Sequence, residues 1–102
     1  MGGWMLYGAN GYTAQLILEL ALKAGQRPVL AGRNSVAINA LAKQHGLPAR
    51  IFDLDHPDTL ASALSGIDAV LHCAGPFSAT AAPMLEGCLQ VGAHYLDITG
   101  EI

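Results

Sequence analysis

The feature that most constrains the fold is a G-x-x-G-x-x-A motif near the N-terminus, formed by Gly8, Gly11 and Ala14. An apolar run from Trp4 to Tyr7 precedes it, and a helical pattern from Gln15 to Ala24 follows it. A strand that turns this sharply into a helix needs a residue without Cβ, which Gly8 provides. Gly11 lets the main chain approach a ligand, and the small Ala14 lets helix and strand pack closely.

The start of such a helix is a binding site for a phosphate group. Its first N–H groups have no acceptor within the helix, and the helix dipole adds partial positive charge there. The residues of the turn are therefore the first candidates for cofactor binding: Gly8, Asn10, Gly11, Tyr12 and Thr13. The motif also fits a plain strand–turn–helix with incidental glycines, because short glycine patterns recur by chance.

Composition bounds the size and class of the fold. The chain has 102 residues, enough for one small domain. Hydrophobic residues make up 52% of it and charged residues only 13%, about half of the roughly 25% usual in soluble domains. A domain of this size buries only about 60–70% of its unfolded surface. This much apolar material therefore indicates that a second domain or a second subunit covers one face.

Charge and run length argue against two kinds of partner. The net charge is −3 with only five Lys and Arg residues, which does not suit a nucleic-acid surface. The longest apolar run, Leu16 to Leu22, is interrupted by Glu19 and falls short of the roughly 18 residues of a membrane span. We expect neither a nucleic acid nor a membrane as a partner.

The N-terminus and the cysteines bear on the compartment. Met1, Gly2 and Gly3 lack the basic start of a secretory signal, so the cytoplasm is the expected location. Cys73 and Cys88 are not spaced as metal ligands or as a redox pair, and we expect two buried free thiols. The histidines are scattered, and no metal site is predicted: His45, His56, His72 and His94.

Strand and helix patterns alternate along the whole chain, with no hairpin signal between neighbouring strands. This alternation predicts an α/β fold with a doubly wound parallel sheet, helices on both faces and the strand order 3-2-1-4-5 of a Rossmann-like domain. The first strand is apolar enough to be central, and the third is polar enough to lie at an edge. The expected strands are 4–7, 28–31, 49–52, 69–71 within the segment 67–73, and 93–98. The expected helices are 15–24, a second that begins after its cap at position 34 or 35 and ends before Gly46, a third from Pro57 to before Gly66, and a fourth from Pro83 to before Gly92.

Apolar spacing also predicts which side of each helix faces the sheet. Either Asn34 or Ser35 can cap the second helix, and Gly46 can end it. Pro57 suits the first position of the third helix. The predicted inward residues are Leu16, Ile17, Leu20, Ala21 and Ala24 in the first helix, Ile38, Leu41 and Ala42 in the second, and Met84, Leu85, Cys88 and Leu89 in the fourth.

Ligands of such sheets bind beyond the carboxyl ends of the strands, where the second strand leads into Gly32, Arg33 and Asn34. An NAD site usually places an acidic residue about 20 positions after the glycine motif. Here Arg33 stands there, 19 positions after Ala14. A guanidinium could bind the 2′-phosphate of NADP through charge-assisted bonds, so NADP is the expected cofactor and NAD the alternative. A solvated arginine at a helix start would look the same.

Three further strand ends supply candidates. Asp53 and Leu54 would frame the adenine, or merely begin a turn. The residues expected under the ribose and the nicotinamide are Cys73, Ala74, Gly75 and Pro76, although a plain turn also fits them. Asp97 and Glu101 are candidate catalytic carboxylates that orient substrate or transfer a proton, although capping or solvation is the favoured single explanation of each.

Taken together, several segments resemble the N-terminal domain of saccharopine dehydrogenase-like oxidoreductases, a group that includes the trans-acting enoyl reductases. The segments are 7–14, 30–34, 53–55, 73–77 and 92–101. The resemblance implies a Rossmann fold and a nicotinamide cofactor, with NADP suggested by Gly32 and Arg33. The family usually has Gly at the position of Ala14 and Thr at that of Asn10, and often a glycine within the segment 78–82.

The resemblance also implies a larger enzyme. Family members resemble two-domain proteins in which a second domain supplies the substrate pocket and dimer contacts. Residues 1–102 would then be the N-terminal, cofactor-binding part, which binds NADP(H) without turnover on its own and forms a homo-oligomer. A naturally short protein is the other explanation. In that form, a non-catalytic dinucleotide sensor similar to the NmrA-like proteins would bind the cofactor and report redox state to a partner.

Overall fold

The computed structural model describes residues 3–54, 57–73, 84, 87–89 and 91–97. Within them, five parallel strands form one sheet in the order β3-β2-β1-β4-β5, as the alternation predicted. The strands are β1 (Gly3–Tyr7), β2 (Val29–Gly32), β3 (Ala49–Ile51), β4 (Ile67–His72) and β5 (His94–Asp97). The most apolar strand, β1, lies at the centre, and the more polar β3 lies at one edge.

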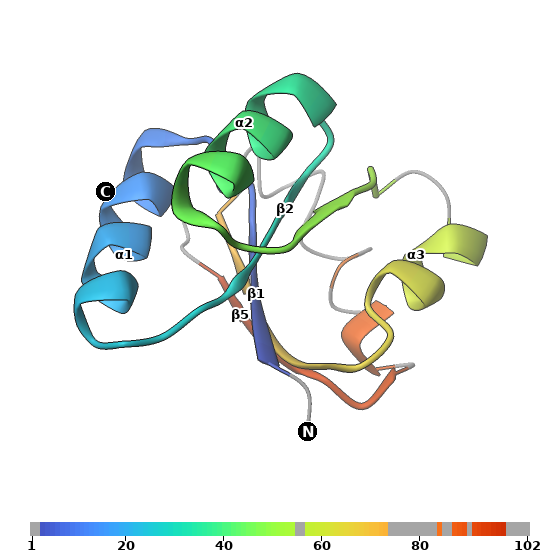
Figure 1. Ribbon diagram of the computed structural model, residues 1–102. Coiled ribbons are helices and arrows are strands. Elements are labelled where there is room, and N and C mark those ends of the chain that lie inside the picture. Colours follow the sequence, from blue (N-terminus) through green and yellow to red (C-terminus); the bar gives the residue numbers. More distant parts are fainter. Residues whose placement is uncertain (1–2, 55–56, 74–83, 85–86, 90, 98–102) are drawn as a thin grey trace.

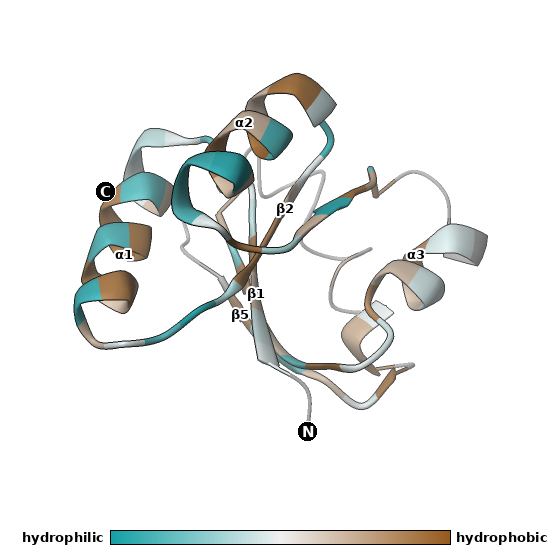
Figure 2. Ribbon diagram, viewed as in Figure 1, coloured by the Kyte–Doolittle hydropathy of each residue, from teal (hydrophilic) through white to brown (hydrophobic). Residues whose placement is uncertain are grey.

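Helices lie on both faces of this sheet (Figure 1). The helices α1 (Tyr12–Lys23) and α2 (Ser35–His45) cover one face. The other face carries α3 (Pro57–Ala63) together with the helical residues Met84, 87–89 and Val91. The fold is the doubly wound α/β architecture expected from the sequence. In Figure 2, β2 has apolar colours where it crosses the middle of the fold, and α1 and α2 show polar colours alternating with apolar ones.

Alternation along β1 divides the core into two halves. Leu6 points toward α1 and α2, whereas Met5 and Tyr7 point toward α3, because successive side chains of a strand face opposite sides. All three are buried. We call these two halves the α1 side and the α3 side of the sheet.

Glycine and asparagine set the helix ends. Gly46 ends α2 in the left-handed conformation, with φ of 66°, and Asn34 caps its start by accepting a hydrogen bond from the Ala37 N–H at 3.1 Å. Asn34 rather than Ser35 is therefore the cap. Pro57 occupies the first position of α3, as predicted.

The predicted inward face of α1 was partly wrong, although Ile17 packs against the core of the α1 side as expected. Leu16 and Leu20 are 46% and 68% exposed, while Ala14 and Leu18 are buried and Leu22 is half-buried. Ala14 must lie against the sheet because the preceding turn holds it there. Every fourth residue after it then follows on the same stripe. Ala24 is also exposed.

The prediction for the last helix was partly wrong. Met84 and Cys88, four residues apart, are fully buried on the α3 side, as expected. Leu89 is instead 72% exposed, because one step along a helix turns a side chain by about 100° away from that stripe. Leu85 lies outside the described residues.

Candidate functional site

The turn between β1 and α1, residues 8–13, is held firmly against β2. We call it the opening turn. Gly8 has φ of 81°, and the N–H groups of Gly8 and Ala9 both donate to the Ala31 carbonyl, at 2.8 and 3.1 Å. Gly11 N–H donates in turn to the Gly8 carbonyl at 3.0 Å. An L side chain at position 8 would be strained, so the backbone itself requires glycine there.

The opening turn leaves the start of α1 uncapped. Gly11 is the N-cap residue, and no side chain of the described residues accepts from the first turn of the helix. The first helical hydrogen bond runs from Gln15 N–H to the Gly11 carbonyl at 3.0 Å. The N–H groups of Tyr12, Thr13 and Ala14 therefore have no acceptor within α1, and together with the helix dipole they favour an anion.

Nothing in the described part of the chain requires position 11 to be glycine. Its φ of −75° is ordinary, and a Cβ there would meet only the Gly8 carbonyl oxygen, at 3.4 Å. The free space beside Gly11 fits the close approach of a ligand to the main chain. Ala14 serves packing instead, since it is only 1% exposed and belongs to the core of the α1 side.

Gly32 lies at the end of β2, beside the opening turn. A Cβ on Gly32 would lie 2.9 Å from Ile38 Cδ1 and 3.7 Å from Asn10 Oδ1. Asn10 therefore reaches from the opening turn to the end of β2. Arg33 follows Gly32 with its side chain exposed, and it forms no hydrogen bond or ion pair with the described part of the chain. A guanidinium that serves no structural contact is free to bind an anion.

The remaining predicted site residues differ in burial and in position. The Leu54 side chain is buried in the core of the α3 side, so only its backbone can border a ligand, whereas Asp53 is half-buried. Asp97 ends β5 opposite His72 of β4. The predicted residues Ala74, Gly75, Pro76 and Glu101, and the side chain of Asp97, lie outside the described residues.

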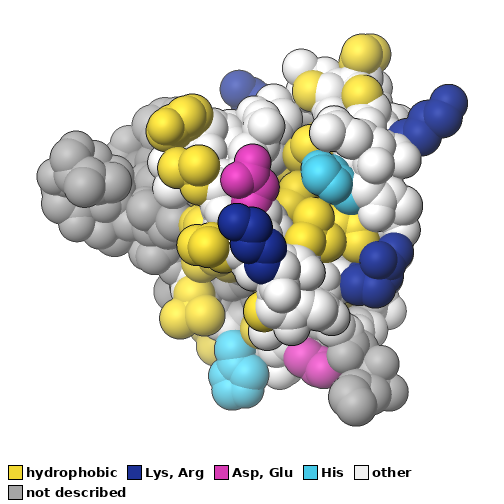
Figure 3. Space-filling view, turned by 60° about the vertical axis from the view of Figure 1, so that its left-hand side comes forward, with side chains coloured by type: hydrophobic (Ala, Val, Ile, Leu, Met, Phe, Trp, Pro, Cys, Tyr) yellow, Lys and Arg dark blue, Asp and Glu magenta, His cyan; other side chains and the backbone are white. Residues whose placement is uncertain are grey.

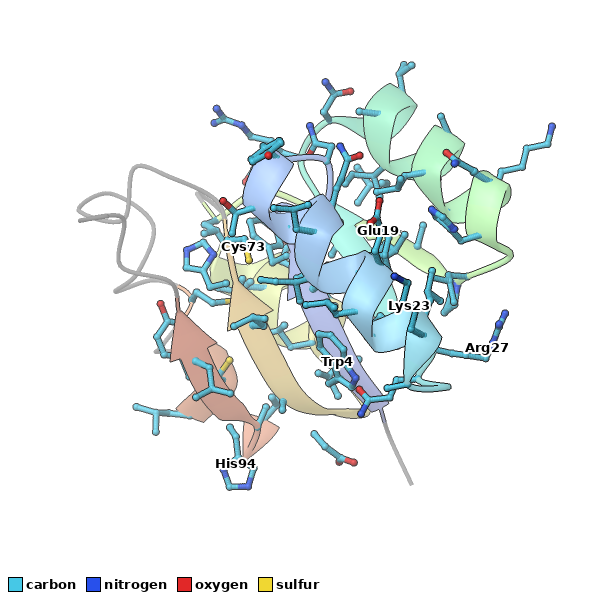
Figure 4. The ribbon with its side chains drawn as sticks, turned by 90° about the vertical axis from the view of Figure 1, so that its left-hand side faces the viewer. Trp4, Glu19, Lys23, Arg27, Cys73 and His94 are labelled. Carbon is cyan, nitrogen blue, oxygen red and sulfur yellow. The ribbon has the colours of Figure 1, made fainter. Side chains whose placement is uncertain are left out.

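Cys73 lies directly after β4, at the same end of the sheet as the opening turn. Its N–H donates to the Tyr7 carbonyl at 2.9 Å, and its side chain packs on the α1 side (Figure 4). Burial raises the pKa of the Cys73 thiol to about 11. At neutral pH the group is a neutral thiol, so it offers a polarisable surface and not a nucleophile.

Sequence reasoning missed a row of rings beneath this end of the sheet. The Tyr7 ring lies 4.9 Å from the Phe52 ring and 5.5 Å from that of His72, and His72 lies 6.1 Å from Tyr95. Tyr7 also donates its hydroxyl to the Phe52 carbonyl at 2.9 Å. His72 is fully buried. The available signal was position, because Tyr7 and His72 each end a strand and are paired in register.

Among the described residues, no group of three or more His, Cys, Asp or Glu side chains could hold a metal ion. None of their helices has the length and apolar character needed to cross a membrane.

Known proteins share this arrangement. Residues 4–101 match the model of the saccharopine dehydrogenase NADP-binding domain family. A trans-acting enoyl reductase of Mycobacterium tuberculosis is 30% identical over 105 residues, which cover 96% of this chain and 25% of that protein. A probable mitochondrial saccharopine dehydrogenase-like oxidoreductase of Arabidopsis thaliana is 30% identical over 113 residues, covering 95% and 25%. The chain thus spans about a quarter of the length of these relatives.

Solved structures share the fold. The triphenylmethane reductase of Citrobacter sp. is 25% identical with a TM-score of 0.78, covering 93% of this chain and 36% of that one. Saccharopine dehydrogenase (L-Glu forming) of Saccharomyces cerevisiae has a TM-score of 0.79 at 21% identity, covering 95% and 21%. Together with the match over residues 4–101, the uncapped helix start and the glycine turn identify the chain as an NADP-binding domain of the saccharopine dehydrogenase family.

Proposed function

We propose that this domain presents NADP(H) for hydride transfer in an oxidoreductase, with the cofactor laid across the carboxyl ends of the strands. The pyrophosphate would rest on the opening turn, formed by Gly8, Asn10, Gly11, Tyr12 and Thr13. The 2′-phosphate would lie at the start of α2, beside Gly32, Arg33 and Asn34. The adenine would lie near Asp53 and Leu54, and the nicotinamide near Cys73, Ala74, Gly75 and Pro76.

The uncapped start of α1 is the observation that carries this proposal. Three backbone N–H groups converge there without a helical acceptor, and the space beside Gly11 is open. A diphosphate supplies the acceptor atoms and the negative charge that this end of a helix favours. The preference for NADP over NAD rests on Arg33, whose exposed guanidinium lacks a structural partner within the described chain. The Citrobacter triphenylmethane reductase, a structural neighbour, was solved in complex with NADP(H).

Turnover requires more than this chain provides. The cofactor supplies the hydride, while the protein supplies position and electrostatics. Asp97 at the end of β5 and Glu101 are our candidates for orienting substrate or transferring a proton. Because relatives named as reductases are about four times as long, we propose that a second domain supplies the substrate pocket. The isolated chain would then bind NADP(H) without turning over a substrate.

An apolar surface beside α1 supports a covering partner. Among the described residues, α1 lies in front of β1 in Figure 4, while β4 and β5 have no helix in front of them. Leu96 of β5, in register with Leu71, is 61% exposed there, and Leu16 and Leu20 of α1 add to this surface. Hydrophobic side chains gather on the same face in Figure 3. We propose that a second domain or a second subunit, as in a dimer, covers it.

The same surface predicts behaviour in solution. The isolated domain should self-associate, and light scattering would detect this; a clean monomer at high concentration would count against an uncovered apolar face.

The two free thiols, Cys73 and Cys88, suit a reducing compartment, which supports our proposal that the protein is located in the cytoplasm.

Titration with NADPH and NADH tests the proposed function. Fluorescence of Trp4 or of the reduced cofactor would report binding, and we expect NADPH to bind more tightly. The Arg33→Ala variant should lose most of that difference, about 10-fold or more, because a charge-assisted hydrogen bond contributes roughly 1.5–3 kcal/mol. Lys43→Ala is the matched control, since it removes an exposed positive charge from the last turn of α2. Equal affinities of the unmodified domain for both cofactors would overturn the NADP assignment.

A further inference from the structure

We infer that Tyr7 is a positioning residue for the adenine of the cofactor, acting through the segment of chain that leaves β3. The inference rests on the proposed function, which places the adenine near Asp53 and Leu54. Tyr7 ends β1, and its side chain is buried on the α3 side of the sheet, away from the proposed cofactor site. Its hydroxyl group nevertheless binds the chain directly after β3.

The Tyr7 side chain crosses beneath β2 to make this contact. Neighbouring strands lie about 4.8 Å apart, so only a long side chain of β1 can pass β2 and reach β3. The residue of β2 in register with Tyr7 is Ala31, which is buried on the same side and whose single methyl group leaves room for the ring. The Tyr7 hydroxyl then donates to the Phe52 carbonyl at 2.9 Å, and the two rings lie 4.9 Å apart.

Phe52 is the first residue after β3, and both of its backbone groups are hydrogen-bonded. Its N–H donates to the Gly32 carbonyl at 3.0 Å, which continues the pairing with β2 by one residue. Its carbonyl accepts from Tyr7, on the α3 side of the sheet. Together these two bonds fix the direction in which the chain leaves the sheet.

The two residues that follow are held between this anchor and the core. Leu54 is only 7% exposed and belongs to the core of the α3 side. Asp53, between Phe52 and Leu54, is half-buried. With Phe52 fixed on one side and Leu54 on the other, the border of the proposed adenine site is formed before a ligand arrives. A border that needs little ordering on binding raises affinity.

The hydroxyl group gives position 7 a reason to be tyrosine that packing alone does not. Phenylalanine would keep the ring contacts, but it carries no donor for the Phe52 carbonyl. The opening turn is held separately, because the Gly8 and Ala9 N–H groups donate to the Ala31 carbonyl. Loss of the hydroxyl group should therefore weaken binding of the adenine part of the cofactor and leave the pyrophosphate site intact.

The Tyr7→Phe variant tests this with three ligands. They are NADPH, adenosine 2′,5′-bisphosphate, which carries the adenine half, and reduced nicotinamide mononucleotide, which carries the other half. We expect about 5-fold weaker binding of NADPH and of the bisphosphate, as the loss of one hydrogen bond allows, and less than about 2-fold change for the mononucleotide.

Tyr95→Phe is the matched control. It removes the same hydroxyl group from another ring of the row, on β5 and away from Phe52. All three affinities should stay within about 2-fold of those of the unmodified domain, well below the effect of losing the Tyr7 hydrogen bond. Thermal unfolding would check that both variants are folded.

The outcomes distinguish this inference from the proposed function. An unmodified domain that binds none of the three ligands overturns both. Unchanged NADPH affinity in Tyr7→Phe overturns the role of Tyr7 alone. An equal loss for the mononucleotide does the same, because a general loosening of the fold weakens every ligand. A loss confined to NADPH and the bisphosphate, and absent from Tyr95→Phe, supports the inference.

Discussion

Two glycines of this domain stand in opposite surroundings. Gly11, in the opening turn, faces open space, and a Cβ there would meet a single carbonyl oxygen at 3.4 Å. Gly87, on the α3 side, faces the core, and a Cβ there would lie 2.9 Å from two atoms of Leu60 and 3.0 Å from Leu64 Cδ1. Within the described chain, packing requires glycine at position 87 and does not require it at position 11.

The different surroundings of these glycines separate positions that packing explains from positions that ligand binding explains. Close helix packing explains Gly87, and a positive φ explains Gly8. Neither reason applies to Gly11 within the described chain, which supports our proposal that a ligand comes close to the main chain there. Substitutions at the three positions should therefore separate into effects on stability and effects on cofactor binding.

The largest effect is expected at Gly87. Gly87→Val would drive two methyl groups into Leu60 and Leu64, which are both buried, and overpacking of this kind costs about 2–3 kcal/mol. Urea unfolding would measure the loss. Gly3→Val is the control, because a Cβ at Gly3 meets nothing within 4 Å, and it should leave stability almost unchanged. A Gly87→Val variant as stable as the unmodified domain would show that this contact is looser than described.

Gly8→Ala should cost less, about 1–2 kcal/mol, because alanine must adopt the left-handed conformation at φ of 81°. The loss should appear in urea unfolding without any cofactor present. If Gly8→Ala kept full stability and lost only NADPH affinity, the backbone argument for Gly8 would fail, and the glycine would belong with Gly11.

Gly11→Ser should separate stability from binding most clearly. Serine is a better N-cap than glycine, and its hydroxyl can accept from the free N–H groups of Thr13 or Ala14. Stability should stay equal or rise by a few tenths of a kcal/mol. NADPH should bind about 10-fold more weakly, a change of about 1.4 kcal/mol, because the hydroxyl competes with phosphate for those groups. Unchanged NADPH affinity would mean that the phosphate lies elsewhere.

The smallest effect is expected from the ionisation of the two cysteines. Cys73 follows β4 at the same end of the sheet as the opening turn, and Cys88 is the neighbour of Gly87 in the core of the α3 side. Burial raises the pKa of both thiols, that of Cys73 to about 11. The folded state therefore holds these protons at pH values where the unfolded chain loses them. Stability should fall as pH rises from about 9 to 11.

Urea unfolding between pH 8 and 11 would measure this decline. The Cys73→Ala variant should show a shallower fall than the unmodified domain, since one of the two raised pKa values is removed. An identical pH dependence in both proteins would contradict the contribution of Cys73.

The strand order could be predicted because alternating patterns and right-handed connections leave few topologies. The face of α1 could not, because two stripes of that helix have helical spacing. Leu16, Leu20 and Ala24 form one, and Ala14, Leu18 and Leu22 form the other. Only the tertiary contact of Ala14 with the sheet selects the second stripe.

The candidate site divides in the same way. The opening turn could be predicted because glycine spacing and local backbone geometry determine it. The proximity of Asn10 to Gly32 and the row of rings at Tyr7 and His72 depend on strands that are distant in sequence. No local pattern indicates such contacts. Asn34 is intermediate, since its position before α2 predicted a cap while its neighbour Arg33 suggested a phosphate ligand.

Backbone amide NMR of the domain during titration with NADPH tests the central claim most directly. If the pyrophosphate binds at the start of α1, the amide signals of residues 9–14 should shift most strongly and saturate together. The same signals should move in the Arg33→Ala variant, only at higher NADPH concentration. Saturation of the domain with these amides unmoved would contradict the account.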